Sequence, residues 1–187
     1  MKNKIEASIK EDIQVKEELL KNQASNIYKL ARMMLETVKK GNKILIFGNG
    51  GSAADSLHIA AELVGRFKKE RRSLPAIALS SNVAILTALA NDYSFERIFE
   101  RQVEALGEKG DMALGISTSG KSENVFRGIL KASKIKMKTA VLTGKYKGRL
   151  SRIADLSVCV PSDNTPRVQE SHITIGHIVC ELIENGL

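Results

Sequence analysis

Residues 44–66 read ILIFGNGGSAADSLHIAAELVGR, and this stretch decides the fold. The apolar run at its start indicates a buried strand, the glycines indicate a turn, and the remainder has the pattern of a helix. A strand that passes through glycines into a helix forms a site for an anionic group, because free backbone N–H groups and the helix dipole converge there. His58 and Glu62 share one face of this helix at i, i+4, so the segment offers both a ligand anchor and groups for chemistry.

The alternation of strand and helix continues to the end of the chain. Short apolar runs bounded by Gly, Ser, Asn or Pro predict parallel strands covered on both faces. Such a doubly wound α/β domain binds its ligand beyond the carboxyl ends of the strands. We expect strands at 43–47, 75–79, 112–116, 138–142 and 156–160, helices at 52–68, 83–106 (with a break at 91–92), 122–135 and 167–185, and ligand-binding loops at 48–55, 80–82, 117–122 and 143–148.

Two further helices are expected before the first strand. Apolar residues recur at helical spacing in 2–21 and again in 26–39. The first segment is long and thinly apolar for a lone surface helix, so we expect it to pack in an oligomer. The chain is therefore interpreted as one domain, 1–187, with oligomer-packing helices in 1–40 and an αβα core in 41–187.

The composition favours a cytoplasmic enzyme over a membrane or nucleic-acid-binding protein. Of the 187 residues 43% are hydrophobic, and no apolar run reaches the roughly 18 residues of a membrane span. The charged N-terminus has no signal-peptide core, and Cys159 and Cys180 lie in apolar runs, so we expect reduced core cysteines in the cytoplasm. The net charge of +8 is dispersed and aromatic residues make up only 4%, so we expect no nucleic-acid partner. A phosphate-ester substrate explains the charge equally well.

Two nucleotide-binding patterns are present without the residues that should accompany them. Gly48-x-Gly50-x-x-Ala53 fits the dinucleotide fingerprint, but the second strand ends in SSN (80–82) rather than in an acid that binds ribose. The segment GISTSGKS (115–122) matches the P-loop pattern, but no later strand ends in the Asp that such an NTPase needs for Mg²⁺. We therefore expect neither a nucleotide oxidoreductase nor an NTPase.

The segment STSGKS (117–122) instead predicts a phosphate cradle of another kind. Hydroxyl groups and the amides of a helix N-terminus together bind a phosphate monoester without a metal. A Ser-rich helix cap is the alternative, but one hydroxyl would suffice for a cap. The hydroxyl residues are Ser117, Thr118, Ser119 and Ser122.

The chain has three histidines, and two of them share the last helix. On an ideal helix His172 and His177 point about 140° apart, whereas Gln169 and His177 differ by about 80°. At most one of these two histidines is therefore expected to face a given pocket. We expect His172 to be structural.

Four motifs together carry a family resemblance. They are GNGGSAADSLHIAAEL (48–63), ANDYSFERIFERQVEALGEKGD (90–111), GISTSGKSENV (115–125) and VPSDNTPRVQESHITIGH (160–177). From about residue 40 to the C-terminus the chain resembles the phosphoheptose (sedoheptulose-7-phosphate) isomerases of the sugar-isomerase, or SIS, fold. The resemblance implies a three-layer αβα sandwich with a five-stranded parallel sheet in flavodoxin-like order. It also implies a homotetramer with the N-terminal helices at its centre and active sites at subunit interfaces.

Matching motif positions imply the site residues. The resemblance implies one Zn²⁺ per subunit, held by His58, Glu62, Gln169 and His177, with Glu62 and His177 as the acid–base pair. A carboxylate or imidazole bound to zinc is a weaker base and an amide is a poor zinc ligand, so the role of the ion stays open. Gly176 beside His177 departs mildly from the family pattern, as does Val168. The implied substrate contacts are Asn49, Gly50, Gly51, Ser52, Glu62, Asn91, Asp92, Ser117, Thr118, Ser119, Ser122 and Gln169.

The resemblance implies an aldose–ketose isomerase. The reaction would convert sedoheptulose 7-phosphate to D-glycero-D-manno-heptose 7-phosphate through an enediol, as the first step toward an activated heptose for lipopolysaccharide or capsule. Two alternatives remain: a non-catalytic protein of this fold that binds a replication initiator, and an isomerase of a pentose or amino-sugar phosphate. The first needs no His/Glu set, and all four proposed ligands are present here.

Overall fold

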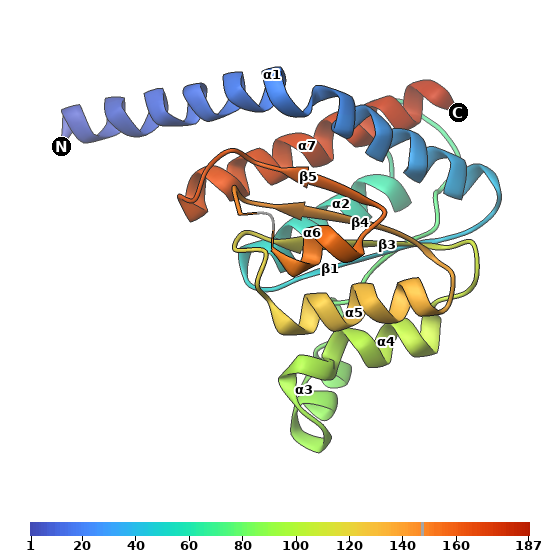
Figure 1. Ribbon diagram of the computed structural model, residues 1–187. Coiled ribbons are helices and arrows are strands. Elements are labelled where there is room, and N and C mark those ends of the chain that lie inside the picture. Colours follow the sequence, from blue (N-terminus) through green and yellow to red (C-terminus); the bar gives the residue numbers. More distant parts are fainter. Residues whose placement is uncertain (147) are drawn as a thin grey trace.

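The computed structural model describes residues 1–146 and 148–187, and it is built around a five-stranded parallel sheet (Figure 1). The strand order β2-β1-β3-β4-β5 is the flavodoxin-like order and confirms the expected fold. The expected strands are all present, with bounds shifted by a residue or two. They are β1 (Ile44–Gly48), β2 (Ala76–Ala78), β3 (Met112–Ser117), β4 (Lys138–Thr143) and β5 (Leu156–Cys159).

The central strands are apolar because helices cover both of their faces. Every residue of β1 and β3 is buried, and side chains alternate between two cores. Ile44 and Ile46 of β1 lie in the core under α1 (Lys2–Lys39), α2 (Gly51–Val64) and α7 (Thr165–Gly186). Leu45 and Phe47 lie in the opposite core, under α4 (Ile98–Leu106), α5 (Glu123–Lys134) and α6 (Arg149–Ile153).

Strand register brings the predicted binding loops to one edge of the sheet. Gly48, the last residue of β1, is the register partner of Ile116 in β3. The loop that opens α2 and the loop that opens α5 therefore lie next to each other at the carboxyl edge, as expected for a doubly wound sheet.

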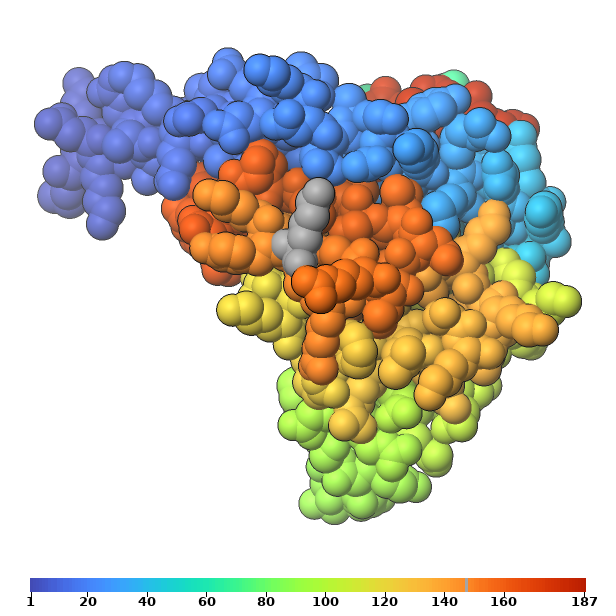
Figure 2. Space-filling view, in the orientation of Figure 1, coloured from blue at the N-terminus to red at the C-terminus, as the bar shows by residue number. Residues whose placement is uncertain are grey.

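The helix α3 (Val83–Asp92) stands apart from the sheet and projects from the molecule (Figures 1 and 2). The expected break near residues 91–92 is confirmed, because α3 ends there and the turn η1 (Phe95–Arg97) leads into α4. None of the residues of α3 is buried, although the helix is rich in apolar side chains.

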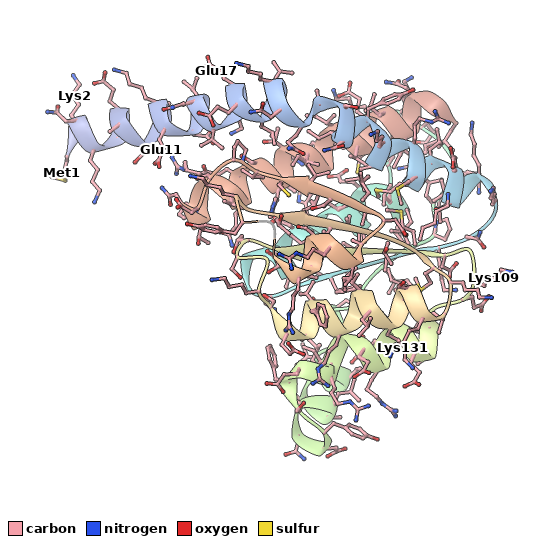
Figure 3. The ribbon with its side chains drawn as sticks, in the orientation of Figure 1. Met1, Lys2, Glu11, Glu17, Lys109 and Lys131 are labelled. Carbon is pink, nitrogen blue, oxygen red and sulfur yellow. The ribbon has the colours of Figure 1, made fainter. Side chains whose placement is uncertain are left out.

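The N-terminal segment corrects the prediction of two helices. Residues 2–39 form one continuous helix, α1. The intervening residues 22–25, NQAS, interrupt the apolar pattern but contain no glycine or proline, so nothing in their backbone chemistry ends a helix. The first turns of this helix extend beyond the body of the molecule, as the positions of Met1 and Lys2 in Figure 3 show.

Two smaller differences concern other helices. The helix α2 ends at Val64 rather than at residue 68, and Gly65 is its C-cap. The short helix α6 was not predicted, and of the expected loop 143–148, residue 147 lies outside the described residues. Cys159 and Cys180 are free and buried, as expected for core residues. In the described part of the chain, no helix combines the length and the apolar character that crossing a bilayer demands.

Candidate active site

The turn between β1 and α2 requires glycine for two different reasons. A Cβ on Gly48 would lie 2.7 Å from Ser52 Cβ and 2.8 Å from the carbonyl oxygen of Ile116, so strand and helix approach too closely for a side chain. Gly50 has a φ of +55°, in the left-handed region that glycine adopts at no cost. It is also the N-cap of α2 and provides no side-chain cap, which leaves the first turn of the helix able to bind an anion.

A pair of amides joins this turn to the neighbouring loop. Asn49 Nδ2 donates to Asn124 Oδ1, and Asn124 Nδ2 donates to Asn49 Oδ1, each at 2.8 Å. Asn124 is buried in the first turn of α5 and also accepts from the backbone N–H of Val125. The sequence reasoning missed Asn124. Its only sequence signal is a polar residue directly after the Ser-rich loop at the start of an otherwise amphipathic helix.

Two hydroxyl groups of the 117–122 loop bind each other rather than the helix. Ser117 Oγ lies 2.9 Å from Ser122 Oγ, and Ser119 Oγ accepts from the backbone N–H of Lys121 at 3.2 Å. Ser122 is the N-cap of α5, yet its side chain makes no capping hydrogen bond. The arrangement therefore favours the cradle over the helix-cap interpretation, because the residue best placed to cap directs its hydroxyl elsewhere.

Three of the predicted site residues meet between α2 and α7. His177 Nε2 of α7 lies 3.0 Å from His58 Nε2 of α2, and the two rings are 5.1 Å apart between centroids. Glu62 Oε1, one turn further along α2, lies 3.2 Å from His58 Nε2. The side chains of His58 and Glu62 keep 48% and 24% of their exposure, so a ligand has access to them. The three expected residues are thus brought together within one chain, from segments 115 to 119 residues apart in the sequence.

Gln169 of α7 also lies against α2, but at the other end of that helix. A Cβ placed on Gly51 would lie 2.7 Å from Gln169 Cδ, so the amide rests directly on the first residue of α2. Since Gly51 opens α2 and His58 lies seven residues later, the Gln169 amide and the histidine pair are separated by about 10 Å along the helix.

His172 is buried on the sheet side of α7, as expected for a structural residue. Its Nε2 lies 3.3 Å from the carbonyl oxygen of Thr143 in β4. Burial lowers the pKa of His172 to about 4, although the Thr143 carbonyl opposes this shift. The ring is therefore neutral at pH 7 and takes no part in the cluster around His177.

Asp55 lies one turn before His58 and was not singled out in the sequence. Burial raises the pKa of Asp55 to about 6, and the nearby imidazole of His58 opposes this shift. Its position adds a carboxyl group that titrates close to neutrality beside the histidine pair.

The structure does not bring Asn91 and Asp92 to the cluster of His58, Glu62 and His177. Both are exposed at the end of α3, where Asn91 Nδ2 donates to Asp92 Oδ1 at 2.9 Å. Helix α3 packs against η1 and α4, on the other side of the sheet from α2 and α7 (Figure 1).

The donor set fits zinc in its chemistry. Imidazole nitrogen and carboxylate oxygen are usual zinc ligands, and ligands at about 2.0–2.1 Å in a tetrahedral site lie about 3.3 Å from one another. The spacings of His58 to His177 and to Glu62, 3.0 and 3.2 Å, are close to this value. Within residues 1–146 and 148–187, however, no group of three or more His, Cys, Asp or Glu side chains is arranged so that it could hold a metal ion. Gln169, an amide that contacts Gly51, is the weakest member of the predicted set.

Comparison with known proteins shows the family of this chain. The model of the SIS domain family matches residues 9–144. The phosphoheptose isomerase of Aquifex aeolicus is 54% identical over 98% of this chain and 96% of its own. That of Thermodesulfovibrio yellowstonii is 50% identical over 100% of this chain and 93% of its own. The chain belongs to the phosphoheptose isomerase family.

Solved structures of this family have the same fold over almost the whole chain. The phosphoheptose isomerase of Neisseria gonorrhoeae superposes with a TM-score of 0.94 at 38% identity, covering 98% of both chains. That of Francisella tularensis gives 0.95 at 38% identity, covering 98% of this chain and 97% of its own. The chain is therefore an isomerase, and the expected family and fold are confirmed.

Proposed function

We propose that the protein converts sedoheptulose 7-phosphate to D-glycero-D-manno-heptose 7-phosphate through an enediol. The observation that carries the proposal is the 3.0 Å approach of His177 Nε2 to His58 Nε2. It supports an acid–base role for His177, because His58 contacts both His177 of α7 and Glu62 of α2. Membership of the phosphoheptose isomerase family supports the choice of substrate.

The phosphate of the substrate binds at the carboxyl edge of the sheet. Ser117, Ser119 and Ser122 supply hydroxyl groups there, and the uncapped first turn of α2 supplies backbone amides. The Asn49–Asn124 pair holds these two loops together, so the cradle is preformed. A preformed anion site fixes one end of the sugar and thereby limits where its other end reaches.

Helix α2 sets the distance between the phosphate and the reacting carbons. His58 lies about 10 Å and Glu62 about 16 Å along the helix from Gly51. When its terminal phosphate is held in the cradle, an open seven-carbon chain therefore extends along α2. Its carbons C1 and C2 then lie near His58, Glu62 and His177. The isomerase needs exactly these two carbons beside its acid–base groups.

The reaction moves two protons, and Glu62 and His177 divide the transfers between them. A base removes a proton from C1 of the ketose while an acid protonates O2, which gives the enediol. A proton is then delivered to C2 while O1 loses its own, which gives the aldose. Both residues lie within reach of the same short segment of substrate, as general acid–base catalysis requires.

A zinc ion is part of this proposal. His58, Glu62 and His177 would hold it. Gln169, whose amide rests on Gly51, would become a fourth and weaker ligand only if its side chain swung along α2 toward the histidines, and it would also contact substrate. Bound there, zinc would polarise the substrate's oxygens as a Lewis acid. The close spacing of the imidazole and carboxylate donors supports this set.

We further propose a homotetramer in which neighbouring subunits complete each site. The apolar helix α3 has no buried residue, with Val83 69% exposed, and Phe95 just after it is 57% exposed. On α1, Ile5, Ile9 and Ile13 are 62%, 57% and 51% exposed. Such surfaces are typical of subunit contacts. Docking α3 onto a second subunit would carry Asn91 and Asp92 to that subunit's substrate, which their own chain does not do.

The product belongs to the first step toward an activated heptose for lipopolysaccharide or capsule, and the reaction takes place in the cytoplasm. The two free, buried cysteines support this location. The intact His58, Glu62 and His177 cluster favours an enzyme over a non-catalytic protein of the same fold. An isomerase of another sugar phosphate remains the alternative that the assay must separate.

The deciding experiment is an isomerase assay on sedoheptulose 7-phosphate beside a panel of pentose and amino-sugar phosphates. The protein is assayed as purified, after chelation, and after Zn²⁺ is added back. We expect turnover of the seven-carbon substrate above the others, loss on chelation and recovery with zinc. Absence of heptose turnover under all three conditions would overturn the proposed function. Full activity after verified metal removal would overturn the role of zinc alone.

A further inference from the structure

The segment between α2 and β2, residues 65–75, has no helix or strand, yet one carboxylate holds much of it in place. Glu184 of α7 accepts hydrogen bonds from the backbone N–H groups of Phe67, Lys68 and Lys69, at 2.8, 2.8 and 3.0 Å. The side chain of Glu184 is only 2% exposed. Burial alone would raise its pKa, but these N–H groups and the charge of Arg71 hold the pKa of Glu184 below its ordinary value. Glu184 is therefore buried and ionised, and both of its carboxylate oxygens accept hydrogen bonds.

Arg71 extends this contact to the end of α2. Its Nε donates to Glu184 Oε1 at 3.1 Å, and its side chain is 8% exposed. Its Nη2 donates to the carbonyl of Glu62 at 2.7 Å, and its Nη1 donates to the carbonyls of Leu63 and Gly65, each at 2.9 Å. A cation at these carbonyls is also favoured by the helix dipole. One guanidinium thus joins the last turn of α2 to α7.

Each end of this contact lies on a helix that carries one member of the acid–base pair. Glu62 is one of the residues whose carbonyl Arg71 holds, and Glu184 lies seven residues after His177, two turns along the same face of α7. The same segment places the ring of Phe67 5.5 Å from the ring of His177, tilted by 30°. The backbone N–H of Phe67 is itself bound by Glu184.

We propose that Arg71 and Glu184 form a clamp that positions the acid–base pair. The clamp fixes Glu62 on α2 against His177 on α7, and it holds Phe67 over the His177 ring. Neither Arg71 nor Glu184 touches the substrate, so both are positioning residues. This inference rests on the proposed isomerase function for its kinetic consequences, but its structural consequences are independent of that function.

A merely structural ion pair would have different effects from a positioning clamp. Asp111 provides the matched control, because its side chain is 2% exposed and pairs with Lys43 Nζ at 2.6 Å. It also accepts from the backbone N–H groups of Lys43 and Glu108, each at 2.9 Å. Asp111 immediately precedes β3, at the amino edge of the sheet near Lys109 in Figure 3, away from the catalytic cluster. Replacing Asp111 therefore removes a comparable buried carboxylate without touching the clamp.

The experiment compares Arg71→Met, Arg71→Lys, Glu184→Gln and Phe67→Leu with Asp111→Asn in the full-length protein. Turnover of sedoheptulose 7-phosphate gives kcat and KM, and thermal unfolding gives the loss of stability. We expect the Arg71 and Glu184 variants to lose roughly tenfold to 100-fold in kcat, with KM within about twofold, because the phosphate cradle is untouched. Arg71→Lys should behave like Arg71→Met, since an ammonium cannot bridge the carboxylate and three carbonyls. Asp111→Asn should lose stability without a specific loss of kcat.

The second readout needs no turnover. With only three histidines in the chain, the ¹H–¹³C ring signals of His58, His172 and His177 can be assigned by substitution. Phe67→Leu removes the ring current on His177, and we expect the Arg71 and Glu184 variants to move the His177 signals in the same direction while the His172 signals stay fixed. Unmoved His177 signals in folded Arg71 and Glu184 variants would overturn the clamp, as would losses of kcat no larger than that of Asp111→Asn. If the wild type does not isomerise the sugar, the proposed function fails while the signals still decide the clamp.

Discussion

Gly51→Ala tests whether the Gln169 amide must sit on the start of α2. The φ of Gly51 lies outside the left-handed region, so alanine fits this backbone without strain, and alanine is the better helix former. Its methyl group would lie 2.7 Å from Gln169 Cδ, whereas ordinary contact begins at 3.4 Å. Gln169 Nε2 would lie closer still, so the amide must retreat by about 1.3 Å to reach ordinary contact. The three atoms nearest to the added methyl all belong to Gln169.

If Gln169 touches substrate as proposed, a displacement of this size lowers the rate by an amount that can be calculated. Misplacing a group by about 1 Å lowers turnover by up to about 100-fold. We expect Gly51→Ala to lose tenfold to 100-fold in kcat/KM on sedoheptulose 7-phosphate, while its thermal stability is unchanged or slightly raised. Initial rates and thermal unfolding of the same samples measure both quantities.

The double variant with Gln169→Ala provides the control. Once the Gln169 side chain is absent, the atoms nearest to the methyl at residue 51 are gone, so Gly51→Ala should cost little further in that background. Full activity of Gly51→Ala would show that the position of Gln169 is not critical. An equal cost with and without the Gln169 side chain would show that the methyl group acts elsewhere.

The remaining predictions concern the base, the pH dependence, the subunit contacts and the metal. Glu62→Gln should abolish turnover while its elution volume in size-exclusion chromatography is unchanged. Substantial residual isomerase activity would show that Glu62 is not an acid–base residue. His172 is neutral when folded, because burial lowers its pKa to about 4, whereas the unfolded chain binds a proton below about 6.5. Stability should therefore fall as pH drops from about 6.5 toward 4, by up to roughly 3 kcal/mol, and denaturation curves of His172→Gln should lack this component. Asp55, whose raised pKa acts in the opposite direction, is present in both the wild type and His172→Gln, so its contribution cancels in their comparison. A stability difference between these two proteins that does not vary with pH would contradict a buried, neutral His172. Phe95→Glu, on an exposed apolar surface, should weaken the oligomer measured by light scattering, and an unchanged mass would argue against an α3 contact. The purified protein should contain about one zinc per chain by mass spectrometry, and a metal-free protein with full activity would refute that stoichiometry.

The sheet and most helices were predictable because their signals are local. Each buried strand is a short apolar run between breakers, and the helices between them carry the 3.6-residue period. The failure at residues 22–25 has the same origin, since the apolar pattern lapses there while the backbone chemistry still favours a helix. Packing of the C-terminal half of α1 on α7 and β5 keeps the helix intact through a stretch that the pattern alone describes as a break.

The candidate site was predictable only where its geometry is set within one element. The spacing of His58 and Glu62 follows from α2 alone, and the opposite directions of His172 and His177 follow from α7 alone. The Asn49–Asn124 pair depends on the register between β1 and β3, and the contact of Phe67 with His177 depends on an irregular segment. No residue pattern specifies either contact, because each arises from tertiary packing.

Helix α2 is long enough that contacts at its first turn do not fix the position of its last turn. The first turn is fixed by β1, by the glycine turn and by the Gln169 amide, but Glu62 lies about 16 Å further along the helix. A tilt of only about 3° around the first turn would therefore move Glu62 by nearly 1 Å, enough to cost up to about 100-fold in rate. Such a tilt would hardly change the position of the proposed phosphate-binding groups at the first turn. The demand for accuracy is thus greatest at the end of α2 that the sheet does not hold, which is where Arg71 binds its carbonyls.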